Sequence, residues 1–398
     1  MSHQTFPLQK KYQTPEYLRS MPHLRVRTPF NALLLRFRSR CIAQLTSYLL
    51  QRDFVQTHPP IITSSDCEGA GAVFNISAGS AKQSSPSPHG GRDGPSDTDD
   101  FFRSPKYLTV SSQLHLEALA QSVGRVWALS PTFRAEKSDT SRHLSEFYML
   151  EAEVNFADHL GVIMDLVEDI LRDLTNSIYP TRIGDEIIRG RRRRGSDGET
   201  RPDAASDELE SRWRGMMSGG WPRIAYADAL DVLRHSGRTF QHTATWESGL
   251  QAEHERFIAA SVGQGKPVFV TAYPRASKPF YMLPSASGPH AHRTVDCFDL
   301  LVPDACEIAG GSMREHRLRQ LLEAMREHGL DSEADGAGEG SSDAARGRLG
   351  WYVDLRRWGS VPHGGFGLGF DRLLGYLAGL PSVRDVAAFP RWAGRCDC

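Results

Sequence analysis

Two neighbouring segments combine a cation, a carboxylate and an aromatic ring in a pattern that suits a nucleotide. FRAE, at Phe133–Glu136, is followed by a polar loop and then by RHLSEF, at Arg142–Phe147. On a strand Arg134 and Glu136 share one face, and Phe147 returns on a partner strand. Such a surface could hold a purine nucleotide, with Arg on phosphate, Glu on an exocyclic amine and Phe stacked on the base. A surface ion pair between two strands is the plainer alternative.

A glycine-rich segment, GFGLGFDR at Gly365–Arg372, is the second feature that could approach a ligand. Closely spaced glycines let the backbone come near a bound molecule, and Arg372 would lie one turn into a following helix. The segment does not match a P-loop, which requires GxxxxGK[ST]. Taken alone, this pattern is more typical of a turn than of a phosphate site.

A third segment, DLLVPDACEIAGGSMRE at Asp299–Glu315, places two acids where adjacent strands could bring them together. Asp299 and Glu307 could then share one Mg²⁺, a hard ion that prefers oxygen ligands. Arg314 follows two glycines in the same segment. Two acids at this spacing are common, so the pattern alone leaves the metal site open.

The composition excludes several classes of protein. The chain has 398 residues with 47 Lys and Arg against 48 Asp and Glu, a net charge of −1 that argues against general coating of a polyanion. No apolar run approaches the roughly 20 residues of a membrane helix. The six cysteines form no CxxC pair and follow no secretory signal, so reduced intracellular thiols are expected. The 15 histidines show no zinc-binding spacing.

Helices and strands alternate along the chain in a pattern that predicts an α+β fold. Apolar residues recur at helical spacing after Thr28-Pro29, near 113–122 and over 160–174. Hairpin-length separations between strands predict a mostly antiparallel sheet flanked by helices. The strands are expected at 126–129, 146–156, 267–273, 280–283, 294–301 and 307–310.

The segment EFYMLEAEVNF, at Glu146–Phe156, predicts a strand whose two faces differ. Tyr148, Leu150, Ala152, Val154 and Phe156 would form an apolar face, and the other face would carry Glu151 and Glu153. Because burying unpaired carboxylates is costly, the acidic face should line a wet cleft.

Three stretches are poor in large apolar residues and are expected to be disordered insertions, at about 77–100, 184–220 and 331–348. The second contains the run Arg191–Arg194, which could touch RNA or serve as a targeting signal. A solvated loop is the plainer interpretation.

Together, the motifs resemble those of class II aminoacyl-tRNA synthetases. FRAE-loop-RHxxEF is similar to motif 2, GxGxGFDR to motif 3, and the long helix after Thr28 with Pro60 to motif 1, the dimer element. Finer features resemble asparaginyl-tRNA synthetases, closest to the fungal mitochondrial type, over essentially the whole chain outside the insertions. The segments that carry this resemblance are HLRVRT, SDCEGAG, YLTVSSQLHLEA, SRHLSEF, EIAGGSMRE and SVPHGGFGLGFDR.

The resemblance implies a class II catalytic domain over 29–398 that activates asparagine with ATP and transfers it to tRNA(Asn). In activation the amino-acid carboxylate attacks the α-phosphorus, so no protein nucleophile is needed. It also implies roles for the matching residues. For ATP, Arg134 would bind the α-phosphate, Glu136 would accept from the adenine amine, Phe147 and Arg372 would stack on the base, and Arg142 and His143 would bind the outer phosphates. Asp299 and Glu307 would bind Mg²⁺. For asparagine, Glu68 and Gln113 would bind the α-ammonium group, and Arg314 and Glu117 would bind the side-chain amide.

The same resemblance suggests how the chain is organised and where it works. Residues 1–28 resemble the junction that leads out of an N-terminal OB-fold anticodon domain of about 100 residues, which is expected to be missing. A homodimer through the motif 1 helix is expected, with no membrane association. The mitochondrial matrix is favoured and the cytoplasm is the alternative, since residues 1–30 form no clear presequence.

Some positions depart from the family pattern and leave alternatives open. Gly249 stands where an acid is usual, Leu283 where a basic residue is common, and Ala305-Cys306 replaces a glycine-containing turn. These departures concern catalytic efficiency more than reaction type. The alternatives are an aspartyl-tRNA synthetase, which shares the class II core, and a paralogue that binds nucleotide or a partner without charging tRNA.

Overall fold

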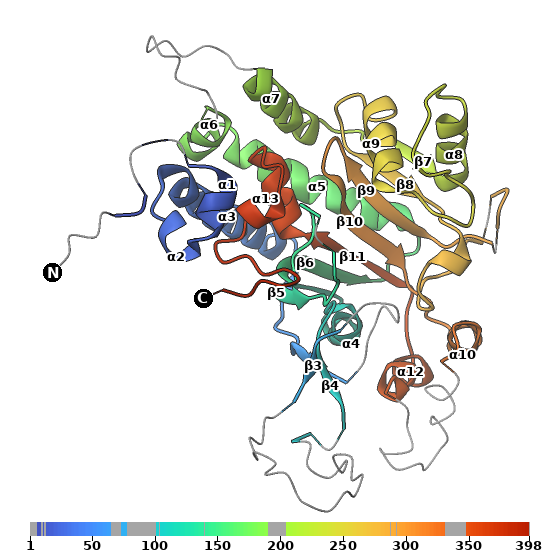
Figure 1. Cartoon of the computed structure of the whole chain (residues 1–398). Coiled ribbons are helices and arrows are strands. Elements are labelled where there is room, and N and C mark those ends of the chain that lie inside the picture. The colour runs from blue at the N-terminus through green and yellow to red at the C-terminus, as the bar shows by residue number, and fades with distance from the viewer. Residues whose placement is uncertain are drawn as a thin grey trace, which may run out of the picture.

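The computed structural model, shown in Figure 1, describes most of the chain. It describes residues 6–8, 11, 13–64, 73–77, 101–102, 104–138, 140–189, 204–286, 288–291, 293–330 and 348–397. The expected insertions at 77–100 and 331–348 lie outside this part except for Ser77 and Arg348, and so does Glu68. None of the helices in the described ranges combines the length and apolar composition needed to cross a bilayer.

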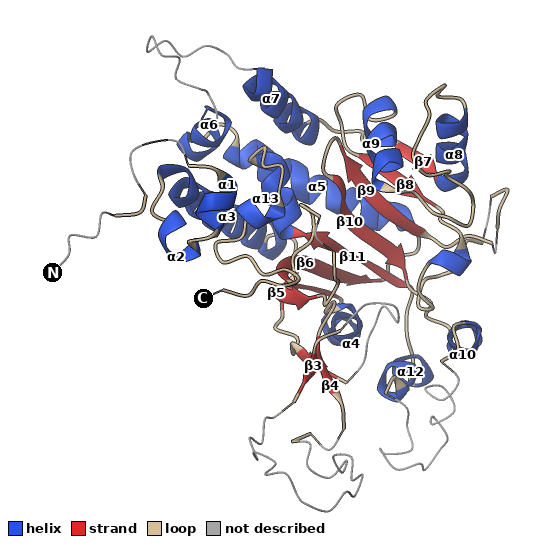
Figure 2. Cartoon of the chain, viewed as in Figure 1, coloured by secondary structure: helices blue, strands red, loops and turns tan. Residues whose placement is uncertain are grey.

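An eight-stranded sheet forms the centre of the molecule, as Figure 2 shows. Its six inner strands run antiparallel, and the short edge strands β1 and β7 pair parallel with their neighbours. The predicted α+β fold with a mostly antiparallel sheet is therefore confirmed. The strand order is β1 (Val55–Gln56), β5 (Arg125–Phe133), β6 (Glu146–Asn155), β11 (His363–Gly369), β10 (Cys306–Met313), β9 (Cys297–Val302), β8 (Val268–Thr271) and β7 (Arg223–Ala225).

One face of the sheet is covered by helices that share a single large core with it. Trp127, Leu150, Phe298 and Phe366 point into this core from four strands. Burial of such side chains is the main stabilising contribution of the fold. The helices are α3 (Pro29–Leu50), α5 (Leu160–Ile178), α6 (Arg182–Arg189), α7 (Ala204–Met217) and α13 (Phe370–Leu377).

In the part of the chain that the structure describes, helices cover the other face at its two ends. At one end α4 (Gln113–Val123) packs on β5 and β6 through a small cluster that includes Leu116 and Val126. At the opposite end α8 (Tyr226–Arg234) and α9 (Ala252–Ser261) pack on β8 and β9. The middle strands β6, β11 and β10 are left to line a cleft between these two covers.

The remaining elements border this cleft or extend the edges. A second core joins α10 (Leu318–Glu327) and α12 (Gly350–Arg357) to the start of α4. The other elements are α1 (Pro15–Arg19), α2 (Pro22–Arg25), the 3-10 helices η2 (Arg275–Ser277) and η3 (Val383–Asp385), and a small sheet of β2 (Ile62–Thr63), β4 (Lys106–Leu108) and β3 (Asn75–Ile76).

The strand expected at 146–156 forms as β6, and its acidic face lines the cleft as predicted. Phe156 departs from the pattern, because it follows the strand with a φ of 60° and is 78% exposed. The prediction of a strand at 280–283 is wrong, because this segment forms an isolated bridge between Met282 and Arg314 instead of a strand. The glycine-rich segment forms the central strand β11 (His363–Gly369) rather than a turn, the plainer alternative for this pattern taken alone.

The prediction that 184–220 is a disordered insertion is wrong for the helices at its two ends. The end of α6 and all of α7 lie within it, and residues 190–203 fall outside the described part. Trp213 of α7 is fully buried, and its indole N–H donates to Leu377 O at 2.8 Å. Composition missed this anchor because one large buried aromatic can hold a helix whose other residues are mostly polar.

Candidate active site

Three cavities lie in a row along the cleft. The central cavity, about 140 Å³, is lined by Arg134, Glu136, Arg142, His143, Phe147 and Arg372. It shares Arg134 and Glu307 with the acidic cavity, about 550 Å³, whose wall includes Glu151, Glu153, Asp299 and Arg314. On its other side it shares Arg142 and Arg372 with the arginine cavity, about 380 Å³, to which Arg212 and Arg256 also contribute.

The central cavity is built by the hairpin of β5 and β6. The hairpin continues past the strand end, since Arg134 N–H donates to Ser145 O at 3.0 Å. The Arg134 guanidinium then lies 5.8 Å from the centre of the Phe147 ring. Glu136 lies across from His143, with Oε2 3.5 Å from Nε2. A cation, an aromatic face and a carboxylate therefore meet here, as a nucleotide requires.

Two further contacts fix the charged groups of the central cavity. Arg372, on the first turn of α13, donates from Nη1 to the backbone oxygen of Glu307 at 3.0 Å. Burial lowers the pKa of His143, against the opposing effect of Glu136. A neutral imidazole near pH 7 can still hydrogen-bond to a phosphate without adding charge.

Asp299 and Glu307 lie on the neighbouring strands β9 and β10 and face the same space. Gly310 pairs with Asp299, and a Cβ built on Gly310 would lie 3.4 Å from both Asp299 Oδ1 and Glu307 Oε1. Burial, followed by the charge of Asp299, raises the pKa of Glu307. A cation placed between the two carboxylates would relieve this cost, and their oxygen donors suit Mg²⁺.

Lys278 is the cationic partner of Asp299 in the structure. Its Nζ donates to the two carboxylate oxygens at 3.0 and 3.2 Å. Although burial alone would lower it, the pKa of Lys278 is raised because of Asp299. Sequence reasoning missed Lys278, because nothing in its local segment distinguishes it from a surface lysine.

A buried ion pair forms the floor of the acidic cavity. Arg314 donates from Nε and Nη2 to the two oxygens of Glu153 at 3.2 and 3.1 Å, and both residues are nearly inaccessible to solvent. Gly365 makes room for this pair, because a Cβ there would overlap the Glu153 carboxylate and the Ala152 carbonyl. A bidentate pair of this kind fixes the orientation of the guanidinium toward a ligand.

Glu117 lies behind the cavity wall rather than on it. Its Oε2 accepts from Arg356 Nη2 at 2.6 Å, Tyr352 OH at 2.7 Å and His363 Nε2 at 3.2 Å. Its Oε1 accepts from Gln113 Nε2 at 3.0 Å. Burial alone would raise the pKa of Glu117, but Arg356 and its other cationic neighbours lower it, so the carboxylate stays charged.

This placement corrects the expectation that Glu117 accepts directly from a ligand amide. The side chain is fully buried, does not line the acidic cavity and already has partners on both oxygens. Gln113, one turn earlier on α4, reaches the cavity wall. Glu151 holds the start of this helix by accepting from Ser112 N–H at 3.0 Å.

The structure thus places ten of the twelve expected site residues on the central or acidic cavity. Glu117 is set back from it, and Glu68 lies outside the described residues. Sequence reasoning did not single out Glu153, although the alternating pattern of β6 had placed it on the cleft face. The ten residues are Gln113, Arg134, Glu136, Arg142, His143, Phe147, Asp299, Glu307, Arg314 and Arg372.

Comparison with known proteins agrees with this fold. A family model described as tRNA synthetases class II (D, K and N) matches residues 14–393. The chain therefore belongs to the class II tRNA synthetases of this group.

Within this group the chain falls among the asparagine–tRNA ligases. It is 40% identical to the mitochondrial asparagine–tRNA ligase of Saccharomyces cerevisiae, over 98% of this chain and 74% of the relative. It is 37% identical to the asparaginyl-tRNA synthetase of Mus musculus, over 98% of this chain and 73% of the relative. The asparaginyl-tRNA synthetase of Pyrococcus horikoshii, solved with asparaginyl-adenylate, superposes with a TM-score of 0.76 at 30% identity, over 96% of this chain and 74% of that one.

Proposed function

We propose that this chain activates asparagine with ATP to give asparaginyl-adenylate and pyrophosphate, and then transfers asparagine to tRNA(Asn). The observation that carries the proposal is the junction of two cavities at Arg134. On one side lie Glu136, Phe147 and Arg372, which suit a purine nucleotide. On the other lies the Arg314–Glu153 pair, which suits a small polar side chain. The names of the relatives described above support the same activity.

The reaction needs positioning and neutralisation of charge more than a protein nucleophile. A carboxylate oxygen of asparagine attacks the α-phosphorus of ATP, and the bond to the bridging oxygen of pyrophosphate breaks. Arg134 borders both cavities and would donate to the α-phosphate where the two substrates meet. Phe147 and Arg372 would hold the adenine ring between them, while Glu136 accepts from its amine. Arg142 and His143 would bind the outer phosphates.

Asp299 and Glu307 would hold Mg²⁺, which supplies neutralisation of phosphate charge when it is bound. Their fit is supported by the shared space above Gly310, to which one oxygen of each carboxylate is directed. Lys278 would hold the Asp299 carboxylate in place through its two hydrogen bonds.

Asp299→Asn should raise the Mg²⁺ concentration required for half-maximal pyrophosphate exchange by about tenfold, because the site loses one anionic oxygen. The measurement is a magnesium titration of exchange at saturating ATP and asparagine. Asp296→Asn is the matched control, since Asp296 lies in the same segment but does not line the cavities. An unchanged magnesium dependence in Asp299→Asn would remove this residue from the metal site.

Selectivity for asparagine over aspartate would rest on the charges around Arg314. Its guanidinium could donate to a side-chain carbonyl in either substrate. Glu153 already neutralises Arg314, and Glu117 adds a second negative charge with Oε1 3.9 Å from Arg314 Nε. Arg356 in turn pairs with Glu117, so the cluster has no unbalanced positive charge to hold the carboxylate of aspartate, whereas a neutral amide needs none.

Glu117→Gln should narrow the preference for asparagine over aspartate by about tenfold, because it removes one buried negative charge. The measurement is kcat/KM for exchange with each amino acid. Glu168→Gln is the control for buried carboxylates: Glu168 is also buried, but it accepts from Gly220 N–H, away from the cavities. Unchanged discrimination in Glu117→Gln would exclude the indirect role.

A homodimer through the motif 1 region is supported by exposed apolar side chains at one edge of the sheet. Leu50 at the end of α3 is 69% exposed, and Phe156 after β6 is 78% exposed. Val55 and Val123 are also exposed. These ends lie near one another, because Arg125 donates to Arg52 O and Asn155 N–H donates to Gly124 O. A second copy would cover this apolar edge.

The double variant Leu50→Glu/Phe156→Glu should convert the dimer to a monomer, because each protomer would bury two added charges. Light scattering after size-exclusion chromatography measures the mass. The conservative pair Leu50→Met/Phe156→Leu should remain dimeric. An unchanged dimer in the glutamate variant would place the interface elsewhere.

The mitochondrial matrix is the proposed compartment. The support is the 40% identity to a mitochondrial asparagine–tRNA ligase. The protein expressed from its own gene should co-fractionate with matrix markers, and recovery in the cytosolic fraction alone would contradict this assignment.

Charging of tRNA tests the full reaction. The chain should attach radiolabelled asparagine to a tRNA(Asn) transcript and leave a tRNA(Asp) transcript uncharged. Charging of tRNA(Asp) with aspartate would favour the aspartyl alternative. Activation of asparagine without any charging would favour a paralogue that no longer serves tRNA.

A further inference from the structure

The arginine cavity has no assigned role, although it opens from the nucleotide site. It shares Arg142, Arg372 and Val383 with the central cavity. It shares no lining residue with the acidic cavity at the opposite end of the row. The central cavity therefore connects an end with several carboxylates to an end dominated by arginines.

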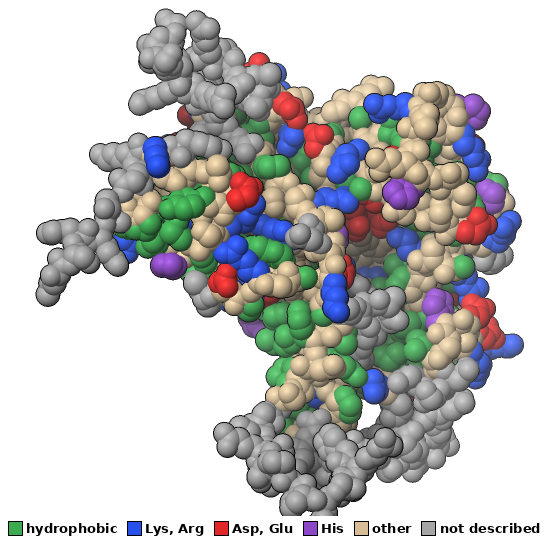
Figure 3. Space-filling model, viewed as in Figure 1, with side chains coloured by type: hydrophobic (Ala, Val, Ile, Leu, Met, Phe, Trp, Pro, Cys, Tyr) green, Lys and Arg blue, Asp and Glu red, His purple; other side chains and the backbone are tan. Residues whose placement is uncertain are grey.

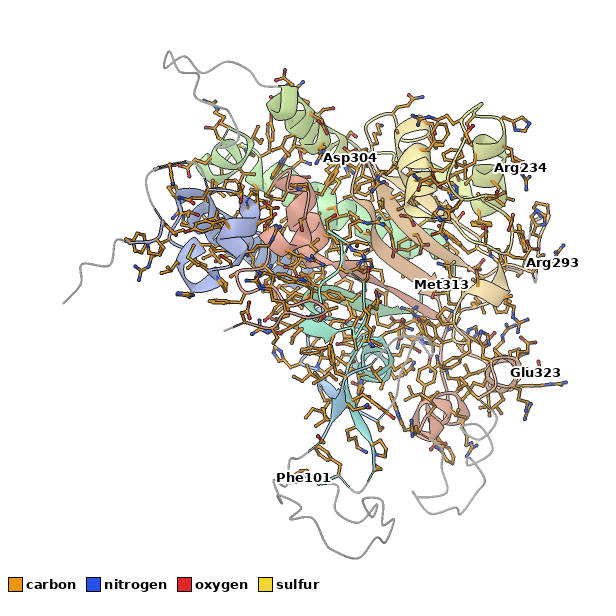
Figure 4. All side chains as sticks on the ribbon, in the orientation of Figure 1. Phe101, Arg234, Arg293, Asp304, Met313 and Glu323 are labelled. Atoms are coloured by element: carbon orange, nitrogen blue, oxygen red, sulfur yellow. The ribbon has the colours of Figure 1, made fainter. Side chains whose placement is uncertain are left out.

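The charge of the arginine cavity is strongly one-sided. Among the described residues its charged lining consists of Arg142, Arg212, Arg256 and Arg372 against the single acid Asp304. Asp304, labelled in Figure 4, lies on the turn between β9 and β10 near α7. Figure 3 shows Lys and Arg side chains beside the hollow between α13 and α9, with Asp and Glu side chains inside it.

This positive charge is only partly balanced by ion pairs. Arg212 donates from Nη2 to Asp304 at 2.9 Å and to Glu208 at 2.5 Å. Its Nε is buried and has no hydrogen-bond partner in the described part of the chain. Arg142 and Arg256 form no ion pair with any residue in the described ranges. Several donors therefore remain available to an anion.

The order of the cavities matches the direction of an in-line displacement. In such a reaction the attacking and leaving oxygens lie on opposite sides of the phosphorus. If the asparagine carboxylate attacks from the acidic cavity, the leaving group must depart on the far side of the central cavity. The arginine cavity meets this requirement, because it adjoins the central cavity and shares no lining residue with the acidic cavity.

We propose that the arginine cavity binds the pyrophosphate released by activation, with Arg212 of α7 and Arg256 of α9 as its ligands beyond the nucleotide site. This inference rests on the proposed function. As the carboxylate–phosphorus bond forms, the bond from the α-phosphorus to the bridging oxygen breaks. The electron pair leaves with that oxygen, which becomes part of pyrophosphate, and no proton or further reactant is required.

A polyanion suits this cavity better than a neutral or singly charged ligand. Pyrophosphate carries several negative charges and at least six acceptor oxygens, so it can engage multiple guanidinium groups at once. Binding there would hold the leaving group apart from the adenylate without occupying the amino-acid end. The same contacts would bind pyrophosphate as the substrate of the reverse reaction.

The test is the dependence of asparagine-dependent exchange on pyrophosphate concentration. Arg256→Gln should raise the KM for pyrophosphate about tenfold, because it removes an unpaired guanidinium donor. The KM values for ATP and asparagine should change less than about twofold, since Arg256 does not line the other two cavities. Arg212→Gln should act in the same direction, with its fold checked by thermal unfolding. Arg326→Gln, an exposed arginine on α10, is the matched control.

Each outcome has a distinct meaning. An unchanged KM for pyrophosphate in both variants would overturn the proposal while leaving amino-acid activation intact. A rise only in the KM for tRNA would also overturn it and would indicate contact with an RNA phosphate. Absence of exchange in the unmodified chain with any amino acid would instead contradict the proposed function itself, and this inference with it.

Discussion

Arg134→Ala should lower asparagine-dependent ATP–pyrophosphate exchange by about 10²–10³, because the variant loses a donor aimed at charge that develops in the transition state. Arg134 borders both the central and acidic cavities, so it lies where the carboxylate and the α-phosphate would meet. The loss should therefore appear in kcat as well as in the KM for ATP. Arg372→Ala should act in the same range, since Arg372 lines the central cavity from its other wall.

Thermal unfolding separates this effect from damage to the fold. Arg134 and Arg372 line cavities rather than the apolar core. The midpoint of thermal unfolding should therefore change little in the two alanine variants. Arg234→Gln is the control, because Arg234 lies at the end of α8, far along the chain from both motifs, with a side chain that is 59% exposed. Near-normal exchange in Arg134→Ala would contradict its assignment to the α-phosphate.

Arg314→Met should lower kcat/KM for asparagine by about 10²–10³, because truncating one member of a buried charge pair costs about 2–5 kcal/mol. The variant loses the guanidinium at the floor of the acidic cavity and leaves Glu153 without its bidentate partner. The KM for ATP should change far less, since Arg314 does not line the central cavity. Exchange kinetics with each substrate varied in turn measure the difference.

A second substitution distinguishes recognition from stability. Arg314→Met alone should lower the unfolding midpoint, because Glu153 remains buried and unpaired. Arg314→Met/Glu153→Gln removes that charge and should recover part of the midpoint without recovering kcat/KM for asparagine. Recovery of both would mean that Arg314 acts only through the fold.

Local motifs predicted much of the central cavity. Arg134 and Phe147 could be placed on facing strands because a short polar loop separates them, and the structure forms that hairpin. Asp299 and Glu307 are eight residues apart and likewise lie on neighbouring strands. In both cases the strand period and a short connection determine which side chains face each other.

Other features depend on contacts between distant segments and could not be predicted in this way. Gly365 lies in a strand, although local patterns associate glycine with turns. The position requires glycine because the Glu153 carboxylate occupies the space that a Cβ would fill. Glu117 lies behind the wall because Arg356, 239 residues away, binds it. Arg212 reaches the arginine cavity because Trp213 anchors α7, in a stretch whose composition indicated disorder.

The most direct test of the central claim is ATP–pyrophosphate exchange with asparagine, with aspartate and with no amino acid. Asparagine should support exchange at least about tenfold faster than aspartate, because Glu153 and Glu117 already balance Arg314 and Arg356 and leave no positive charge for a third carboxylate. No exchange should occur without an amino acid, since the attacking oxygen belongs to the substrate. Exchange that prefers aspartate, or that is absent with both amino acids, would contradict the account.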